Sequence, residues 1–332
     1  MEKKILNIDE YASTNLSNEL KCGSLESEDN IVLRFSDNVS CTPFGMLLMS
    51  NSIKKARNEN SYKNFSISIN KEAASICYAG HMGFFKRISE YINFGKLPGE
   101  AIGNNNYIPI TRIDFVNYRN NLLFKYMDYL SYIEYEAENL AKVLAQENEE
   151  LKKLFTYLLR EIIRNSQEHG KVDEAWICAQ NWKNKNKAEI AILDNGIGYK
   201  NSLKEKYGKI VRNDEESIIL ALRPGITESY NNKYSQEDDN SGFGLYVASE
   251  FCDKLNGSFT IVSGEIMLKR NKGTIVTRKA LHKGAIISMS IDTSIEFEYS
   301  KLLAEIVSKG EQITKSCKAS ELSKGKFLMQ VK

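Results

Sequence analysis

The sequence predicts a two-layer α/β protein, with a smaller N-terminal α/β domain joined by a long helix to helices packed on a mostly antiparallel sheet. Three observations predict this class. Strand-like and helical segments are interleaved before residue 112, and strand segments follow one another across turns after residue 170. Between residues 117 and 170, Leu, Tyr and Phe recur at helical spacing, with no proline and no glycine before Gly170.

The N-terminal domain is expected over residues 1–112. Its first 30 residues are polar without a sustained period, which predicts a loose arm or short elements. The following segments are expected in the order strand, helix, strand, helix, strand: Ile31–Phe35, Pro43–Arg57, Phe65–Ile69, Ala73–Tyr91 and Tyr107–Ile110. Pro43 fits the first turn of a helix, where its missing N–H costs nothing. This order predicts a small α/β layer.

A helical connector is expected over residues 113–150, as one long helix with the stretch that follows or as two helices in series. Its part Tyr132–Glu150 is acidic and amphipathic. Such a segment bridges the two domains, pairs with another helix or lies in solvent, and the sequence leaves the choice open.

The second domain is expected over residues 151–295. Its expected strands are Ala175–Gln180 and Ala188–Leu193, which form a hairpin, and Ser258–Val262, Glu265–Leu268, Thr274–Arg278 and Ala285–Ile291. The long polar stretch Tyr199–Asn240, which contains Pro224-Gly225 and the acidic run from Glu237 to Asp239, is expected to be a lid. Residues 296–332 are expected to be a charged helical tail on the solvated surface.

Composition excludes several classes of function. Among 332 residues, 45 basic and 43 acidic side chains leave a net charge of +2, which provides no field for nucleic acid or an anionic membrane. No apolar run approaches the roughly 20 residues of a bilayer span, and the first residues contain no apolar signal core, so we expect a cytoplasmic protein. The 6 cysteines form no C-x-x-C pair, which argues against a zinc site or a disulfide framework.

The stretch E-I-I-R-N-S-Q-E-H-G, from Glu161 to Gly170, is the first of three that carry chemistry. At about 100° per residue, Glu161 and Asn165 lie on the edge of the apolar stripe and point to the same region outside the helix. An Asn oxygen suits Mg²⁺ shared with phosphates, and a Glu can take a proton from an attacking water. Alternatively, both are boundary residues that cap nearby backbone groups.

The second and third stretches are D-N-G-I-G, from Asp194 to Gly198, and S-G-F-G-L, from Ser241 to Leu245. Asp194 at the end of a strand can accept a hydrogen bond from an exocyclic amino group, although Asp-Asn-Gly is also an ordinary turn sequence. Gly242 and Gly244 precede a helix expected over Leu245–Leu255, so its N-terminal N–H groups can cradle phosphate. The chain contains neither a Rossmann fingerprint nor a P-loop.

In this order, the three stretches resemble the N box, G1 box and G2 box of the GHKL superfamily of ATPases, which includes DNA gyrase, heat-shock chaperones, mismatch-repair proteins, sensor histidine kinases and anti-sigma-factor kinases. The resemblance covers residues 151–291 and implies a Bergerat α/β sandwich that holds ATP between helices and sheet. By this resemblance Asn165 would bind Mg²⁺, Glu161 would be the general base and Asp194 would hold adenine. The other implied ATP-binding residues are Gly196, Gly198, Gly242, Phe243, Gly244 and Leu245.

The chain departs from the superfamily at one point. Where many members have Gly-Thr near the last strand, this sequence has Gly284-Ala285, unless Thr274 after Gly273 is the counterpart. The N-terminal domain, with C-T-P-F-G-M-L-L opening its first helix, is similar in its order of elements to STAS-type domains, which act as interaction modules in anti-sigma circuits.

Two branches of the superfamily fit poorly. None of the 3 histidines, His81, His169 and His282, has the surroundings of a phosphoacceptor, and His282 is expected in a turn. The chain after Ile291 is too short for the transducer domain of the DNA-coupled and chaperone members. We therefore expect a Mg·ATP-binding ATPase that acts as a regulatory switch, in which lid closure is coupled to partner binding; the alternative is an anti-sigma-type serine/threonine kinase.

The expected partner is a protein, STAS-like, sigma-related or a defence effector, in a bacterial regulatory or defence setting. A homodimer is compatible with this architecture, and neither nucleic acid nor a membrane is expected as a direct partner.

Overall fold

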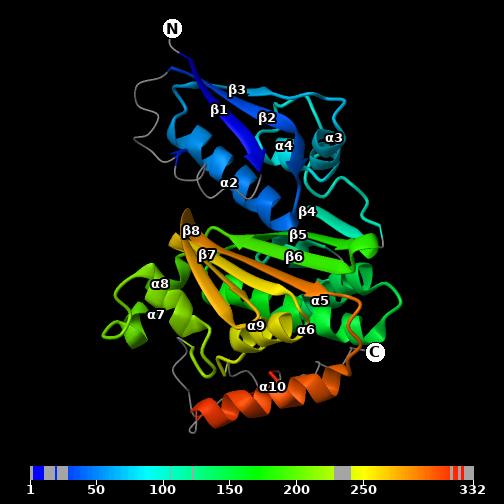
Figure 1. Ribbon diagram of the computed structural model, residues 1–332, viewed down its shortest axis with the longest axis vertical. Helices are drawn as coiled ribbons and strands as arrows, with labels where there is room; N and C mark the ends of the chain where they lie inside the picture. Colours follow the sequence, from blue (N-terminus) through cyan, green and yellow to red (C-terminus); the bar gives the residue numbers. More distant parts are fainter. Residues whose placement is uncertain are drawn as a thin grey trace.

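A computed structural model describes residues 3–10, 19–20, 29–104, 106–121, 123–227, 241–314, 317–320 and 323–324. Two sheets lie one above the other with helix α2 between them, and further helices cover the outer face of the larger sheet (Figure 1). The fold is therefore α/β throughout, as the sequence predicts. Within the described residues, no helix combines the length and apolar character that a bilayer crossing requires.

The N-terminal sheet has three parallel strands in the order β1-β2-β3, formed by Lys3–Glu10, Asn30–Ser40 and Asn64–Ser68. Of the two alternatives expected here, a loose arm or short elements, residues 3–10 form a short element, strand β1. Leu6 and Ile8 point into the core on alternate positions of β1. Two inward residues are too short a pattern to stand out in a polar stretch, and only pairing with β2 defines the strand.

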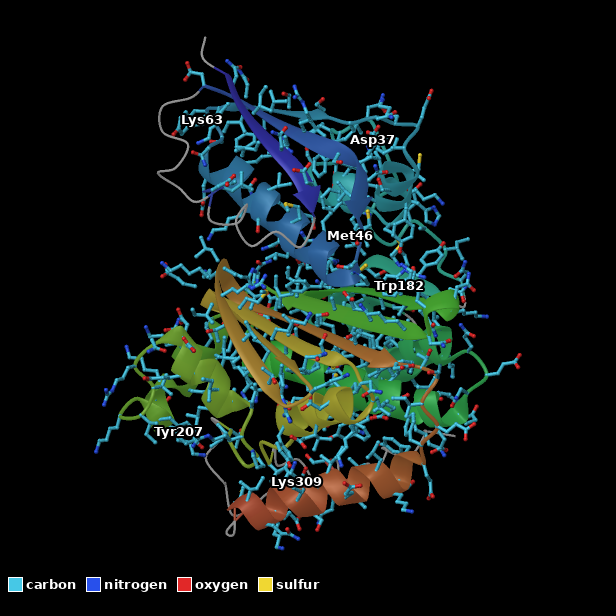
Figure 2. The ribbon with its side chains drawn as sticks, in the orientation of Figure 1. Asp37, Met46, Lys63, Trp182, Tyr207 and Lys309 are labelled. Atoms are coloured by element: carbon cyan, nitrogen blue, oxygen red, sulfur yellow. The ribbon has the colours of Figure 1, made fainter. Side chains whose placement is uncertain are left out.

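Helix α2 (Pro43–Glu59) lies between the two sheets and is buried on most of its circumference. Thr42 caps its first turn, because the Thr42 side chain accepts a hydrogen bond from Gly45 N at 3.1 Å. Met46, which is fully buried, lies in the layer between the sheets (Figure 2). The short helices α3 (Ala74–His81) and α4 (Phe84–Ile88) complete this domain.

The second sheet has five antiparallel strands in the order β4-β5-β6-β8-β7, formed by Tyr107–Asp114, Glu174–Trp182, Lys187–Asp194, Thr274–Asp292 and Ser258–Asn271. The predicted hairpin is β5–β6. The predicted strand at Tyr107–Ile110 exists as part of β4, but it pairs with β5 and so belongs to this sheet instead of the N-terminal layer. The four segments predicted after residue 257 are two long strands, because bulges around Gly264 bend β7 without ending it.

Helices α5 (Tyr129–Ala145), α6 (Glu149–Glu168) and α9 (Gly244–Lys254) cover the outer face of this sheet, and α7 (Gly198–Tyr207) and α8 (Asp214–Ala221) flank it (Figure 1). Two short 3-10 turns, Tyr118–Asn120 and Lys183–Lys185, occupy loops. Helix α5 packs beside α6, so the acidic segment pairs with another helix, which is one of the expected alternatives.

Helix α10 (Tyr299–Thr314) packs against α9 and α6, which corrects the expectation of a solvated tail. Its buried side chains are Tyr299, Leu303, Ile306 and Val307. The Tyr299 ring stacks on the Phe251 ring of α9, with centroids 6.0 Å apart. The sequence of this segment contains an apolar stripe at helical spacing, but its many charged residues suggested a helix exposed to solvent.

Candidate ATP-binding site

Two adjoining cavities lie between the helices and the larger sheet, with empty volumes of about 310 Å³ and 390 Å³. Both are lined by Asn165, His169, Tyr199 and Ser202, so they adjoin across these four residues. The first also contacts Ser166, Gly170, Asp194, Gly198, Ala285 and Ile287. The second also contacts Leu203, Ala221, Ile226, Thr227, Gly242, Gly244 and Leu245. The space therefore runs from Asp194 at one end to the start of α9 at the other.

Asn165 lies between the two ends of this space, near the end of α6. Helix α6 begins after Asn148, whose side chain accepts a hydrogen bond from Leu151 N at 3.0 Å. Leu154, Leu158 and Ile162 are buried on the face of α6 that packs in the core. Asn165 follows on the border of that face, half-buried, where its side chain contacts both cavities.

Asp194 ends β6 at the opposite end of the space and is 5 % exposed. Its Oδ1 accepts hydrogen bonds from Gly196 N at 2.9 Å and from Ala285 N at 3.2 Å. Burial raises the pKa of Asp194 to about 6, against the opposing effect of these bonds and of one with the Ser166 side chain. A buried carboxylate with spare acceptor capacity at a cavity wall can receive an amino group of a planar ring.

A side chain at the glycines of both ends would collide with neighbouring atoms. Gly242 has a φ of +72°, and a Cβ at this position would collide with the backbone of Ile226. A Cβ on Gly244 would collide with the Glu161 carboxylate, and one on Gly196 would collide with the backbone of Gly170. Gly244 is also the first residue of α9, so the N–H groups of this helix end open toward the second cavity.

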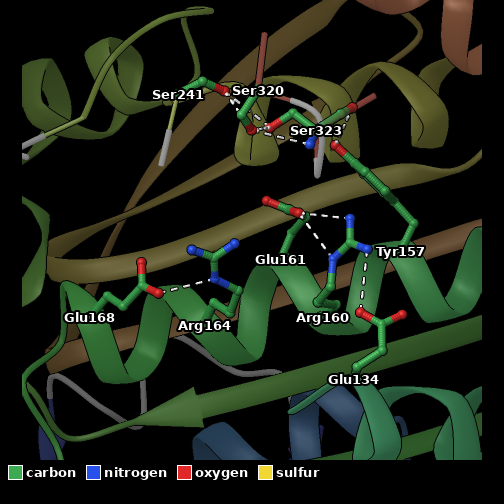
Figure 3. A network of polar contacts seen from close by, with 9 residues as sticks. All are labelled: Glu134, Tyr157, Arg160, Glu161, Arg164, Glu168, Ser241, Ser320 and Ser323. Carbon is green, nitrogen blue, oxygen red and sulfur yellow. Dashed lines mark hydrogen bonds and ion pairs between the residues drawn. The ribbon is translucent and has the colours of Figure 1, made fainter. Parts of the chain in front are cut away.

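Glu161 lies one turn before Asn165 and is 7 % exposed. Its Oε1 accepts a hydrogen bond from Arg160 Nη2 at 3.1 Å, and Arg160 Nη1 reaches Glu134 Oε2 on α5 at 3.4 Å (Figure 3). Its other oxygen lies against Gly244. Glu161 does not line either of these two cavities, so its carboxylate lies behind the first turn of α9 instead of facing the open space.

The remaining sequence-predicted residues lie next to the site. Phe243 is fully buried, with its ring 6.3 Å from the Tyr246 ring. Phe243 and Gly196 therefore support the two glycine-rich turns from behind, whereas Gly198, Gly242, Gly244 and Leu245 line the space itself.

Residues 151–285 match the family model of the histidine kinase-, DNA gyrase B-, and HSP90-like ATPases. This segment is a GHKL-type ATPase domain. The match begins with α6 and ends in β8, and it contains every residue that lines the two cavities except Ile287. A domain of this type binds ATP. No curated protein and no solved structure matches the chain.

The counterpart of the superfamily's Gly-Thr in this ATPase domain is Gly284-Ala285. Ala285 pairs with Asp194 across β6 and β8 and lines the first cavity. Thr274, the alternative, faces Asn271 at the exposed end of the β7–β8 hairpin and lines neither cavity. Hydroxyl groups near Asp194 come instead from Ser166, which bonds to Asp194, and from Ser263, whose Oγ donates to Gly284 O at 2.8 Å.

Sequence reasoning missed several lining residues of the ATPase domain: Ser166, His169, Tyr199, Ser202 and Ala285. Ser166 and His169 stand inside the first motif, where only Glu161 and Asn165 carried recognisable chemistry. Tyr199 and Ser202 lie on α7, in the segment expected to be a lid. Of that segment, residues 228–240, including the acidic run from Glu237 to Asp239, lie outside the described residues.

Proposed function

We propose that this protein binds ATP together with Mg²⁺ and acts as a nucleotide-dependent regulatory switch. One observation carries the proposal: two adjoining cavities lie between a buried carboxylate, Asp194, and the N-terminus of α9 at Gly244, and Asn165 lines both of them. A hydrogen-bond acceptor for the adenine amino group and a helix end for phosphates are thus separated by an amide oxygen. Those are the parts that a purine nucleotide with a metal-bound phosphate tail requires.

The donors available fit a phosphate-bound Mg²⁺. Asn165 would hold the ion through its side-chain oxygen, since Mg²⁺ prefers oxygen ligands and is commonly shared with substrate phosphates and water. Within the described residues, no group of three or more His, Cys, Asp or Glu side chains forms a metal site. The nucleotide phosphates would therefore supply the negative charge that balances Mg²⁺. When bound, the ion would neutralise part of the phosphate charge.

The switch requires a part of the protein that responds to the nucleotide. Helix α7 supplies Tyr199 and Ser202 to the wall shared by both cavities and begins the segment that we propose as the lid, residues 199–240. ATP shifts the population of a closed lid only if it binds that state more tightly. The N-terminal domain is the proposed route by which closure reaches a protein partner.

Titration calorimetry with Mg·ATP tests the proposal. We expect wild-type protein to bind and Gly244→Val to lose binding, because the new side chain collides with the Glu161 carboxylate and blocks the start of α9. Thr274→Val is the control, since Thr274 is exposed at the tip of the β7–β8 hairpin and lines neither cavity. Absence of binding by the folded wild-type protein would reject the proposed function.

An anti-sigma-type serine/threonine kinase is the second candidate. The closeness of Glu161 to Gly244 favours it, because a general base for phosphoryl transfer acts at the phosphate end of the site, although the carboxylate would have to turn out from behind α9 to do so. Glu161→Gln and Asn165→Ala distinguish catalysis from binding alone. If wild-type protein binds Mg·ATP yet neither releases phosphate nor labels a serine-containing partner, the kinase and ATPase readings fail and the sensing role remains.

A further inference from the structure

A buried histidine contacts the adenine end of the ATP site from the opposite face of the sheet. His282, expected in a turn, lies inside β8 and is 3 % exposed. Its Nε2 is 2.7 Å from the backbone oxygen of Asp194. Asp194 faces the cavity with its carboxylate, and the His282 side chain behind it contacts its backbone carbonyl.

Hydrogen bonding defines which imidazole nitrogen carries the proton. The Asn51 side chain, on α2 of the N-terminal domain, places its Nδ2 3.4 Å from His282 Nδ1. An amide nitrogen only donates, so His282 Nδ1 accepts and Nε2–H donates to the Asp194 carbonyl. Burial, together with the positive charges of Lys55 and Arg87, lowers the pKa of His282 to about 4. The ring is neutral at physiological pH, as this arrangement requires.

Asn51 also contacts the turn after Asp194 directly. Its Nδ2 also donates to Asn195 Oδ1 at 3.1 Å, directly after Asp194. Its Oδ1 accepts from Arg87 Nη2 at 3.4 Å, and the Arg87 guanidinium lies 4.6 Å from the centre of the Trp176 ring on β5. Asn51 is itself 8 % exposed. The Asn51 amide is thus held by Arg87. Its NH₂ group donates to Asn195 of the turn and to His282, which in turn contacts the Asp194 carbonyl.

The turn has little freedom to adjust if this support moves. A Cβ on Gly284 would collide with the Asp194 backbone, and one on Gly196 would collide with Gly170. Backbone segments this close transmit a displacement instead of absorbing it. A shift of α2 would therefore move the Asp194 carboxylate relative to Asn165 and the cavity.

We propose that Asn51 and His282 are positioning residues through which the N-terminal domain sets the affinity and base selectivity of the ATP site. The inference rests on the proposed function and adds the structural route by which the two domains are coupled. Coupling is reciprocal: whatever partner displaces α2 weakens adenine recognition, and ATP in turn stabilises the docked position of α2.

Binding of ATP and of inosine triphosphate, which carries a carbonyl in place of the adenine amino group, tests the proposal. For Asn51→Ala we expect the Kd for ATP to rise about tenfold, within the range of roughly 5- to 150-fold typical of coupled sites. The Kd for inosine triphosphate should change much less, so selectivity falls. Asn58→Ala is the matched control, an exposed asparagine on the same helix, and should leave both constants unchanged.

A pair of substitutions at His282 keeps the test independent of folding defects. His282→Gln retains a donor for the Asp194 carbonyl and should preserve selectivity, whereas His282→Phe removes it and should reduce selectivity like Asn51→Ala. A loss of stability alone lowers the folded fraction without altering the ratio of the two constants. Unchanged selectivity in folded Asn51→Ala and His282→Phe would overturn the inference, whereas wild-type protein that binds no ATP would instead reject the proposed function.

Discussion

Asp194 carries a buried charge that costs the unliganded protein stability. Its pKa is about 6 in the folded chain against 3.8 for an unperturbed Asp, with burial as the largest cause. A shift of roughly two pKa units corresponds to about 3 kcal/mol. Because the folded state retains a proton that the unfolded state releases between these values, stability falls as the pH rises from about 4 to 6, and the full cost remains above that.

Substitution by asparagine should separate stability from binding. For Asp194→Asn without nucleotide, we expect the free energy of unfolding at pH 7.5 to increase by up to about 3 kcal/mol, because no charge is buried. The Kd for ATP should rise at least about tenfold, since an amide donor can face the adenine amino group. Urea unfolding and calorimetry measure the two effects; a variant that is less stable and binds normally would contradict this account of Asp194.

The same carboxylate predicts how ATP affinity depends on pH. Protonation removes the acceptor, so the Kd for ATP should rise as the pH falls through the Asp194 pKa of about 6. The change approaches about tenfold per pH unit well below the pKa, for a single proton lost on binding. ATP binding by the Asp194→Asn variant depends on the same other titrating groups as binding by the wild-type protein, including those of the nucleotide. The wild-type Kd divided by that of the variant should therefore vary with pH, and a constant ratio would argue against a role for this carboxylate.

The cluster of Arg160 with Glu161 and Glu134 gives Glu161 a structural as well as a chemical role. Arg160 is 1 % exposed and contacts both carboxylates. Glu161→Ala should lower the free energy of unfolding by about 3 kcal/mol, because a buried guanidinium loses a partner. Glu161→Gln keeps an acceptor oxygen and should cost clearly less in urea unfolding. Equal losses in the two variants would show that the ion pair does not stabilise α6.

At the scale of secondary structure, α10 supports the glycine-rich turn at the start of α9. A Cβ on Gly310 would lie 2.7 Å from the Tyr246 ring and 2.9 Å from the Phe243 ring. The segment after α10 reaches the same place: Ser323 Oγ lies 3.1 Å from Ser241 Oγ, next to Gly242 (Figure 3). Helix α10 and Ser323 are thus packed behind the turn at the start of α9.

Gly310→Val should weaken ATP binding from a distance. The new side chain has to displace Tyr246 or Phe243, and overpacking of this kind costs about 1–3 kcal/mol. We expect a lower melting temperature together with a several-fold higher Kd for ATP. Ser308→Val on the exposed face of α10 is the control and should change neither quantity. Normal ATP affinity in folded Gly310→Val would show that α10 does not hold the turn.

At the scale of the whole molecule, the N-terminal domain and the ATPase domain share a core. Cys178, Ala191, Leu193, Val262 and Ile286, on one face of the larger sheet, belong to the same buried cluster as α2. Polar contacts complete the junction: Phe44 N donates to Glu189 Oε1 at 3.2 Å, and the Tyr78 hydroxyl donates to Gln180 Oε1 at 2.7 Å. Separating the domains would expose an apolar sheet face.

We therefore expect the chain to unfold in one cooperative transition. Both tryptophans, Trp176 and Trp182, lie on β5 near the junction, so their fluorescence reports on its loss while circular dichroism reports on all elements. The two melting curves should coincide, and ATP should raise both midpoints equally. Two separate transitions, with only the later one shifted by ATP, would show that the domains are not coupled.

The sequence by itself determined the fold class, the order of most elements and a compact set of site residues that includes Asn165, Asp194, Gly242 and Gly244. These signals are local. A glycine forced by backbone contact, an Asp at a strand end and an Asn one turn along a helix are recognisable without knowing what lies opposite them. The resemblance to GHKL ATPases added the roles proposed for them.

Only the tertiary structure decided which segments lie against each other. β1 is a strand because β2 is beside it, β4 joins the second sheet because β5 offers an edge, and α10 is buried because α9 presents an apolar face. Asn51 and His282 are 231 positions apart, and no periodicity relates them. Which segments and side chains contact each other depends on the free energy of the whole packed arrangement. The contacts that link the two domains, and the bridging of Glu161 and Glu134 by Arg160, are therefore visible only in the folded chain.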